Sequence, residues 1–297
     1  MIINSANLDA LRVGFSTAFK QGLDQAPTQY GRIATTVPST SKSNKYGWLG
    51  KMPNMREWVG PRHVHGLAEH SYTIENTAEE LTIGVDRDDI EDDNIGVYAP
   101  LFTEMGMSTA SRPDVLIFDL LKAGFTTNCY DGQFFFDTDH PVLDAKGDAT
   151  TVANTDGGAG ASWFLLSTKR ALKPLIYQER RKGQFVAMDR PTDPNVFSKK
   201  EFEYGVDGRW AVGYGFWQMA WGSKQTLDQA HYKAAREGLL GMKGDYGRPL
   251  GIVPDLLVVP PTLEGEALEL LNAERNAAGA TNVYRNTAEL LVVPWLA

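Results

Sequence analysis

The sequence is poor in cysteine, in long apolar runs and in signatures of catalysis, and each shortage excludes a class of protein. Cys129 is the only cysteine among 297 residues, which excludes an intrachain disulfide and fits a reducing cytoplasm. No apolar run approaches the roughly 18 residues that a membrane-spanning helix needs. The N-terminus lacks the basic and apolar regions of a secretory signal. The sequence also lacks four common catalytic or nucleotide-binding motifs: G-x-S-x-G, H-E-x-x-H, G-x-G-x-x-G and the P-loop lysine motif. No motif in it therefore indicates an enzyme.

Basic residues are outnumbered by acidic ones. The chain has 29 Lys and Arg against 37 Asp and Glu, which gives a net charge of −8. This balance argues against a protein that grips nucleic acid by neutralising phosphates. The apolar content of 42% and the charged content of 22% indicate a globular chain, long enough for one large domain or two.

The periodicity of apolar residues predicts helices and strands in an irregular order, which is typical of an α+β fold. Strand-like segments are expected at 71–76, 81–86, 185–222, 256–259 and 289–293. Helices are expected at 7–23 after an Asn7 cap, and at 95–124, 163–181, 226–240 and 263–274. Residues 26–46 are rich in Pro, Ser, Thr and Lys and are expected to form an extended arm.

Residues 46–87 are the most informative segment of the chain. Two alternating patterns at 71–76 and 81–86 flank a short polar stretch at 76–80, which predicts a hairpin. Before them, large apolar groups occur in a segment rich in Gly and Pro, a composition that a packed core rarely recruits. Interfaces favour Trp, Met and Arg. One interpretation is an excursion that contacts neighbouring subunits, with Trp48, Arg56, Trp58, Arg62, Tyr72 and Ile74 as interface residues; the other is an ordinary β-meander within one domain.

Three groups of residues resemble chemical sites. His63, His65 and His70 have a spacing that zinc could use, but surface or interface histidines explain it as well. The sequence Asp-Thr-Asp-His-Pro around His140 resembles a hydrolase cluster, although Asp, Thr and Pro are also turn residues. The acidic run 86–93 lacks the ligand spacing of an EF-hand and suits a helix N-terminus. We expect no catalytic residue, no metal site and no cofactor, and an inert Cys129 thiol.

Four stretches carry a resemblance to a known family. They read GWLGKMPNMREWVGPR, SYTIENTAEELTIGVDRDDIEDDNIGVYAP, DGQFFFDTDHP and PDLLVVPPTLEGEAL. Together they span roughly residues 46–293, and the acidic run followed by GVYAP is the most specific of them. In these stretches the chain resembles the major head (capsid) subunits of Mu-like tailed phages, the T protein of that group.

This resemblance implies the Hong Kong phage-type major capsid fold. Such a fold has an N-terminal arm, an extended hairpin loop, a peripheral domain with a long spine helix, and an axial domain. The implied parts of this chain are an N-terminal helix and arm at 1–45, the extended loop and an acidic connector at 46–93, the peripheral domain at 94–160 and the axial domain at 161–297. The spine helix would occupy 94–124.

The resemblance also implies a function and partners. The chain is expected to be a structural subunit that assembles with itself into the pentamers and hexamers of an icosahedral head around double-stranded DNA, without sequence-specific DNA contacts. Scaffold, portal and maturation protease are the other expected partners, with no membrane involved. The expected location is the virion capsid, after assembly in the host cytoplasm. We expect no covalent cross-link between subunits.

Two alternatives belong to other classes. An encapsulin-like compartment shell would share the fold but would need an inward groove for cargo. A cytoplasmic hydrolase would use the His140 cluster and would need a concave pocket around it.

Overall fold

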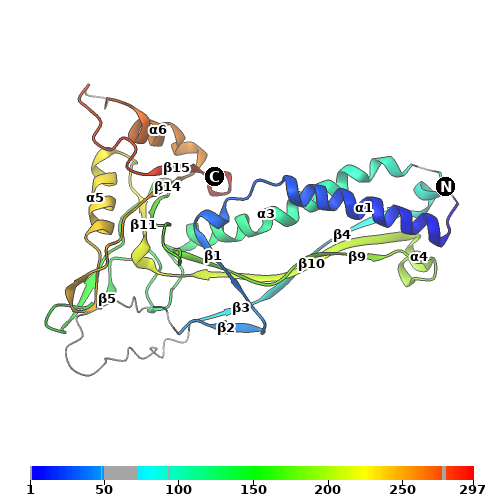
Figure 1. Cartoon of the computed structure of the whole chain (residues 1–297), viewed down its shortest axis with the longest axis horizontal. Helices are drawn as coiled ribbons and strands as arrows, with labels where there is room; N and C mark the ends of the chain where they lie inside the picture. The colour runs from blue at the N-terminus through cyan, green and yellow to red at the C-terminus, as the bar shows by residue number, and fades with distance from the viewer. Residues whose placement is uncertain (1, 48, 50–71, 93, 276–278) are drawn as a thin grey trace.

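The computed structural model describes residues 2–47, 49, 72–92, 94–275 and 279–297. The molecule is elongated, with a long arm at one end and a broader body at the other (Figure 1). The N-terminus lies at the far end of the arm, whereas the C-terminus lies near the junction with the body.

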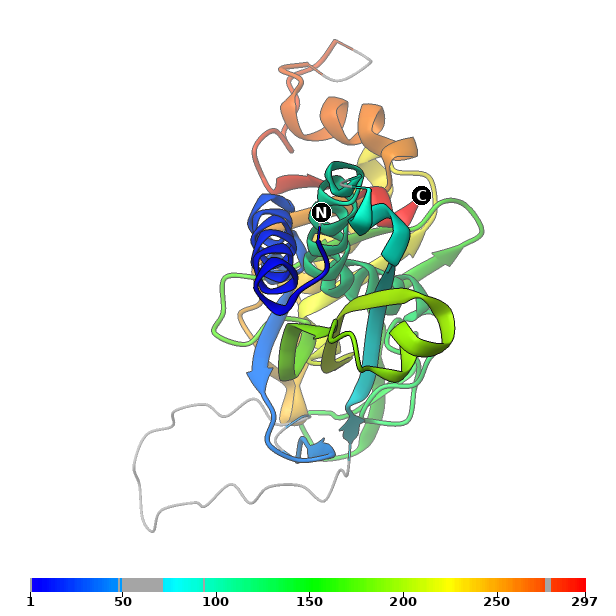
Figure 2. The ribbon, with the colours of Figure 1, turned by 90° about the vertical axis from the view of Figure 1, so that its right-hand side faces the viewer.

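The arm consists of two helices that cover one face of a four-stranded sheet (Figures 1 and 2). Its strand order is β1-β9-β10-β4, with β1 parallel to β9 and the other neighbours antiparallel. The elements of the arm are α1 (Ser5–Gln25), α3 (Ala99–Ala123), β1 (Ala34–Pro38), β4 (Thr77–Asp86), β9 (Leu175–Met188) and β10 (Glu201–Tyr214). The expected helices at 7–23 and 95–124 are therefore confirmed, although the residue that caps the first is Asn4, whose side chain accepts from the Asn7 N–H.

Aromatic side chains fill the space between the helices and the sheet. Phe15 of α1 stacks on Phe102 of α3 at 4.2 Å between ring centroids, and both rings meet Tyr204 of β10 edge-on. These residues are buried in a core that belongs to the distal part of the arm. Burial of a large aromatic side chain contributes roughly 2–3 kcal/mol, so this cluster alone ties both helices to the sheet.

The two helices cross at a pair of glycines. A Cβ on Gly22 would lie 1.9 Å from the Thr103 carbonyl oxygen, and a Cβ on Gly106 would lie 2.1 Å from the Phe19 carbonyl oxygen. No side chain fits between the backbones here. The close crossing of α1 and α3 therefore requires glycine at both positions.

The body is built on a five-stranded sheet of order β15-β14-β8-β11-β7. Every residue of β14 and of β8 is buried, as expected for central strands. The elements of the body are β7 (Thr155–Gly158), β8 (Trp163–Leu166), β11 (Ala220–Lys224), β14 (Leu256–Val259), β15 (Glu289–Val292), α5 (Gln229–Leu240) and α6 (Glu264–Asn272). One large hydrophobic core joins this sheet to the adjoining end of the arm.

Shorter elements connect these two regions. Helix α2 (Arg87–Glu91) begins after Asp86 and has Asp88 and Asp89 in its first turn, which agrees with an acidic run at a helix N-terminus. The other short helices and strands are β2 (Ser43–Lys45), β3 (Thr73–Glu75), β5 (His140–Leu143), β6 (Ala149–Val152), α4 (Pro194–Lys199), β12 (Lys243–Gly244) and β13 (Arg248–Pro249). Single 3₁₀ turns are η1 (Tyr30–Arg32), η2 (Ile95–Val97), η3 (Trp217–Met219), η4 (Asp245–Gly247), η5 (Pro261–Leu263) and η6 (Pro294–Leu296).

The α+β class is confirmed, but three expectations within it are wrong. The segment 185–222, expected to be strand-like, is interrupted by helix α4 and the turn η3. The segments 71–76 and 81–86 do not pair with each other: β3 pairs with β2, and β4 pairs with β10. Only Asn76 separates β3 from β4, so the two run on as nearly one strand. The helix expected at 163–181 is instead β8 and the start of β9, because a short, fully buried apolar run has the same composition in a strand as in a helix.

The two main sheets combine strands from different parts of the chain, and these combinations do not follow the expected boundaries at residues 45, 93 and 160. Strands β9 and β10 lie in the arm, although they follow the last of these boundaries. Strand β4 belongs to the sheet of the arm and not to a free loop. The division into four functional parts stays a prediction. Among the helices of the described ranges, none combines the length and hydrophobicity needed to cross a bilayer.

Candidate assembly surfaces

The segment expected to form the extended loop is bounded by two paired strands, β2 and β3. Ser43, Asn44 and Lys45 pair with Glu75, Ile74 and Thr73 in antiparallel register. The chain between the two strands therefore starts and ends at adjacent points on the underside of the arm (Figure 1). This geometry is what an excursion toward a neighbouring molecule requires.

A buried network of polar side chains holds the base of the loop. The Tyr46 hydroxyl donates to Gln178 Oε1 at 2.7 Å, and Gln178 Nε2 donates to Asn76 Oδ1 at 2.8 Å. Asn76 Nδ2 in turn donates to Ser39 Oγ and to the Ser41 carbonyl, both at 2.9 Å. Because an unpaired polar group in such a place costs about 1–3 kcal/mol, this complete network fixes the base in one arrangement.

Two of the six expected interface residues lie in this base, and their own subunit covers them. Ile74 is buried in the large core. The Tyr72 hydroxyl accepts a hydrogen bond from the Tyr214 N–H at 2.9 Å, and burial raises the pKa of Tyr72 to about 12. Trp48, Arg56, Trp58 and Arg62 lie outside the described residues, as do His63, His65 and His70. The interface role of these positions stays a prediction.

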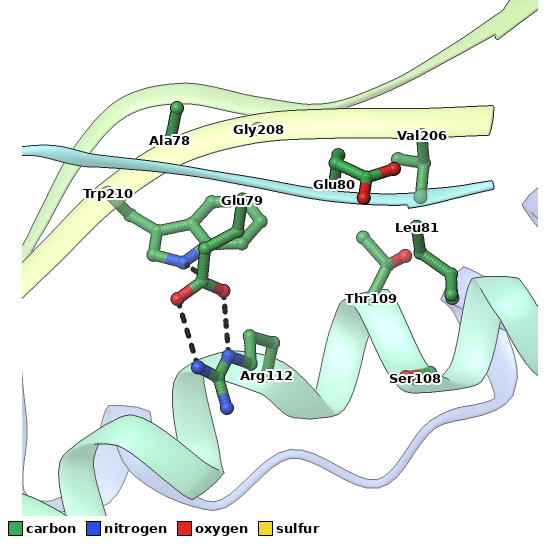
Figure 3. A pocket seen from close by; sticks show the side chains of 10 residues that line it. All are labelled: Ala78, Glu79, Glu80, Leu81, Ser108, Thr109, Arg112, Val206, Gly208 and Trp210. Atoms are coloured by element: carbon green, nitrogen blue, oxygen red, sulfur yellow. Dashed lines mark hydrogen bonds and ion pairs between the residues drawn. The ribbon is translucent and has the colours of Figure 1, made fainter.

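A groove runs between α3 and the strands β4 and β10, just beyond the base of the loop (Figure 3). Its volume is about 520 Å³. Arg112 of α3 reaches across it and donates to both carboxylate oxygens of Glu79 on β4, at 2.7 and 3.0 Å. The Trp210 indole of β10 donates to the same carboxylate at 3.2 Å. These bonds, those from Arg112 first, lower the pKa of Glu79, so the carboxylate is held ionised as a link between helix and sheet.

Sequence reasoning did not identify this link. Glu79 fell in the segment expected to be a hairpin loop, and Arg112 in the middle of a helix more than 30 residues further on. The one hint in the sequence was that Arg112 precedes Pro113, a proline inside helix α3. Nothing in a single sequence points from that position to Glu79.

The far end of the arm presents an exposed aromatic side chain. Phe197 of α4 is 92% exposed. Its short helix is held rigidly, because Asn195 Nδ2 donates to the carbonyls of Met188 and Glu201 at 3.0 and 2.9 Å. A large apolar group on a fixed support is typical of a contact point between proteins.

The hydrolase-like cluster around His140 does not form a catalytic site. His140 is fully buried, and its ring contacts Asp131 and Asn154 instead of the neighbouring Asp137 and Asp139 carboxylates. Burial raises the pKa of the nearby Cys129 thiol, which disfavours the nucleophilic thiolate. A substrate has no access to a ring in this position, so the cluster supports the structure and not a reaction.

Comparisons with known proteins agree on one family. The sequence matches the family described as "Mu-like prophage major head subunit gpT" over residues 8–296. It is 46% identical over 305 residues to the major capsid protein of Escherichia phage Mu, with 100% of both chains covered.

Two solved structures resemble the chain over most of its length. The subunit of the procapsid of bacteriophage JBD30 has a TM-score of 0.87 and 47% identity, covering 99% of this chain and 100% of that one. The subunit of the JBD30 capsid decorated with minor capsid protein trimers has a TM-score of 0.78 and 35% identity, covering 93% of each chain.

Proposed function

The chain belongs to the Mu-like prophage major head subunit gpT family, and from this membership we propose that it builds the shell of a phage head by contacts between arms, loops and bodies of neighbouring copies. It is a structural protein and not an enzyme. The observation that carries the proposal is the match to phage head subunits along nearly the whole chain, in sequence and in fold.

The extended loop is the main contact element in this proposal. Its two ends are held in the subunit by β2, β3 and the buried network, and the part between them is proposed to contact a neighbour. Trp48, Arg56, Trp58 and Arg62 are the proposed anchors, since aromatic and Arg side chains supply most of the free energy of protein interfaces. Each contact needs only modest strength, because a closed shell repeats it many times.

Further partners follow from the same role. The proposed assembly consists of pentamers and hexamers in an icosahedral shell around double-stranded DNA. Scaffold, portal and maturation protease are proposed to meet it during assembly in the host cytoplasm. The decorated JBD30 capsid supports one further partner, a minor capsid protein on the shell. The net charge of −8 fits a shell that encloses DNA without adhering to it.

The two alternative functions are not favoured. A hydrolase needs an accessible His140, and this side chain is fully buried. An encapsulin-like compartment shell is not supported by the family match, which is to phage head subunits over residues 8–296.

Replacement of residues 50–71 by a short Gly-Ser linker tests the proposal. The linker joins adjacent ends of β2 and β3, so the subunit should fold and keep a melting temperature close to that of the parent. Closed shells should be missing in negative-stain images, whereas the parent chain forms them under the same conditions. The narrower deletion is essential, because removal of the whole segment 46–87 would also remove β4 from the sheet of the arm. Closed particles from the linker variant would contradict the contact role of the loop, and an unfolded variant would show that the loop belongs to the core of its own subunit.

A further inference from the structure

Three side chains that are common metal ligands meet in the interior next to the body sheet. Cys129 Sγ, a carboxylate oxygen of Asp131 and a ring nitrogen of His140 all lie within 4.8 Å of one another. His140 is fully buried, and the side chains of Cys129 and Asp131 are nearly so. Thiolate, carboxylate and imidazole are the three donor types that bind zinc in proteins.

The backbone presents the first two donors from one tight turn. The Cys129 N–H donates to the Gln133 carbonyl at 2.7 Å, and Gly132 closes the turn with a positive φ of 89°. The Cys-x-Asp spacing places both side chains on the same side of this turn, 3.0 Å apart between Sγ and Oδ1. His140 arrives from the start of β5 and completes the cluster. The donors are therefore fixed by local structure before any ligand binds.

The hydrogen bonds around His140 identify which ring nitrogen faces the cluster. Asn154 Nδ2 donates to the carbonyls of Phe135 and Trp217, so its Oδ1 is the acceptor. That oxygen accepts from the Asp137 N–H at 2.9 Å and lies 3.2 Å from His140 Nε2, which must then carry a hydrogen. His140 Nδ1 lies 2.8 Å from Asp131 Oδ2. Nδ1 is therefore the ring nitrogen that faces the other two side chains of the cluster.

We propose that Cys129, Asp131 and His140 bind a divalent metal ion of the zinc type. The surroundings of the cluster are those of a metal site. The second ring nitrogen of His140 is hydrogen bonded to an amide oxygen, as it is for most metal-bound histidines. The ring is also stacked on Trp217, 3.8 Å between centroids, which fixes its plane.

Metal binding requires the donors that now contact each other to separate. Zinc–nitrogen and zinc–oxygen bonds are about 2.0–2.2 Å long, so two ligands of a tetrahedral ion lie roughly 3.3 Å apart. The Nδ1 and Oδ2 atoms need to separate by about half an ångström from their present hydrogen bond. Three protein donors leave one position of the ion for water or for the second Asp131 oxygen. The bound ion joins the turn at 129–133 to the start of β5 and acts as a structural staple.

Cobalt substitution tests this site directly. The chain contains one cysteine, so a thiolate-to-cobalt charge-transfer absorption reports on Cys129 alone. Purified, untagged subunit is treated with chelator and titrated with Co²⁺. We expect this absorption to saturate at one equivalent and to disappear on addition of Zn²⁺, with zinc raising the melting temperature. Total zinc uptake is not a sufficient readout, because it does not distinguish this cluster from zinc held by His63, His65 and His70, whose spacing zinc could use.

Substitution of the proposed ligands tests whether the cobalt ion binds at this cluster. C129S should abolish the charge-transfer absorption, and H140Q should weaken cobalt binding at least about tenfold. H231Q is the matched control, since His231 also pairs with an aspartate, Asp156, outside the cluster, and it should bind cobalt as the parent does. If the parent chain shows neither the absorption nor a zinc-dependent melting temperature, the three side chains form a hydrogen-bonded cluster without a metal ion and the proposal is wrong. Unchanged cobalt binding in folded H140Q would overturn it as well. The parent-chain measurement decides the matter even if a variant fails to fold, and it does not depend on shell assembly.

Discussion

At the scale of single residues, Asp114 shows how one buried carboxylate fixes the path of the chain. It lies in the middle of α3, next to Pro113, and accepts hydrogen bonds from the backbone N–H groups of Gln29 and Tyr30 at distances of 2.6–3.0 Å. These donors belong to the segment that follows α1. The side chain therefore decides where the chain turns from the helix layer down to β1.

Replacement of Asp114 by Ala should destabilise the subunit by about 1–3 kcal/mol, because two buried N–H groups lose their acceptor. Asp119, exposed on the same helix, is the matched control, and D119A should change the free energy of unfolding by less than about 0.5 kcal/mol. Urea unfolding of the two variants measures the difference. Equal stabilities would show that Asp114 does not hold the chain.

The charge of Asp114 predicts a dependence on pH. Burial raises its pKa, although the bonds from Tyr30 and Gln29 oppose the shift. The folded state then binds a proton more readily than the unfolded state, so this group makes the protein less stable as pH rises from the unfolded-state pKa through the folded-state pKa. D114N cannot titrate here. The difference in unfolding free energy between the parent and D114N should shift in favour of D114N as pH rises through this window, and a difference that is constant with pH would contradict the shifted pKa.

At the scale of elements, the pairing of α1 with α3 depends on the absence of side chains. The two helices contact each other over most of their length, and Gly22 and Gly106 lie at the closest point. A residue with a Cβ at either position pushes the backbones apart. The aromatic rings that pack beneath the helices would then lose contact with the sheet.

We therefore expect G22A to lower the free energy of unfolding by about 1–3 kcal/mol, the usual effect of overpacking. Gly14 offers a control on the same helix, since a Cβ there meets nothing within 4 Å. G14A should be neutral or stabilise by up to about 1 kcal/mol, because alanine favours the helix. Thermal unfolding of both variants gives the comparison. If G22A is as stable as the parent, the two helices can move apart without a cost in stability, and the close crossing is not required.

Some helices and strands of this fold could be predicted from the sequence, whereas the pairing of others could not. The helices α1, α3 and α5 follow from the spacing of their apolar residues, because that signal is local. The partners of β3 and β4 do not follow, because Glu79 meets β10 residues more than 100 positions away and no turn specifies that pairing. The extended loop stays a prediction from composition, whereas the groove closed by Glu79 and Arg112 was missed, since its two walls are distant in the chain.

At the scale of the whole molecule, the described part of the subunit has two hydrophobic cores. The body carries most of the large core, whereas the arm carries its own smaller aromatic core at the far end. The chain resembles the JBD30 procapsid subunit more closely than the decorated capsid subunit, with TM-scores of 0.87 and 0.78.

The contrast between the loop and its base predicts opposite effects of two substitutions. I74A should lower the melting temperature of the isolated subunit, because truncation of a buried Ile costs about 2–5 kcal/mol. W58A should leave the melting temperature nearly unchanged and raise the critical concentration for assembly about 30-fold or more, the equivalent of roughly 2 kcal/mol per contact. Light scattering of assembly reactions and calorimetry of subunits separate the two effects. A large loss of subunit stability in W58A would place Trp58 in the core of its own subunit.

The near-continuity of β3 and β4 has a mechanical consequence. If a neighbour holds the loop, as proposed, its pull acts along the axis of β4, and all ten residues of that strand are paired with β10. The load is shared by these pairs in shear, whereas a hairpin opened from its end loses its pairs one after another. The three-residue pairing of β2 with β3 is the weaker part of this joint and should yield first. The short β2–β3 pairing would therefore open under a load that the long β4–β10 pairing resists. A strained shell could then stretch at the base of its loops while the sheet of each arm stays intact.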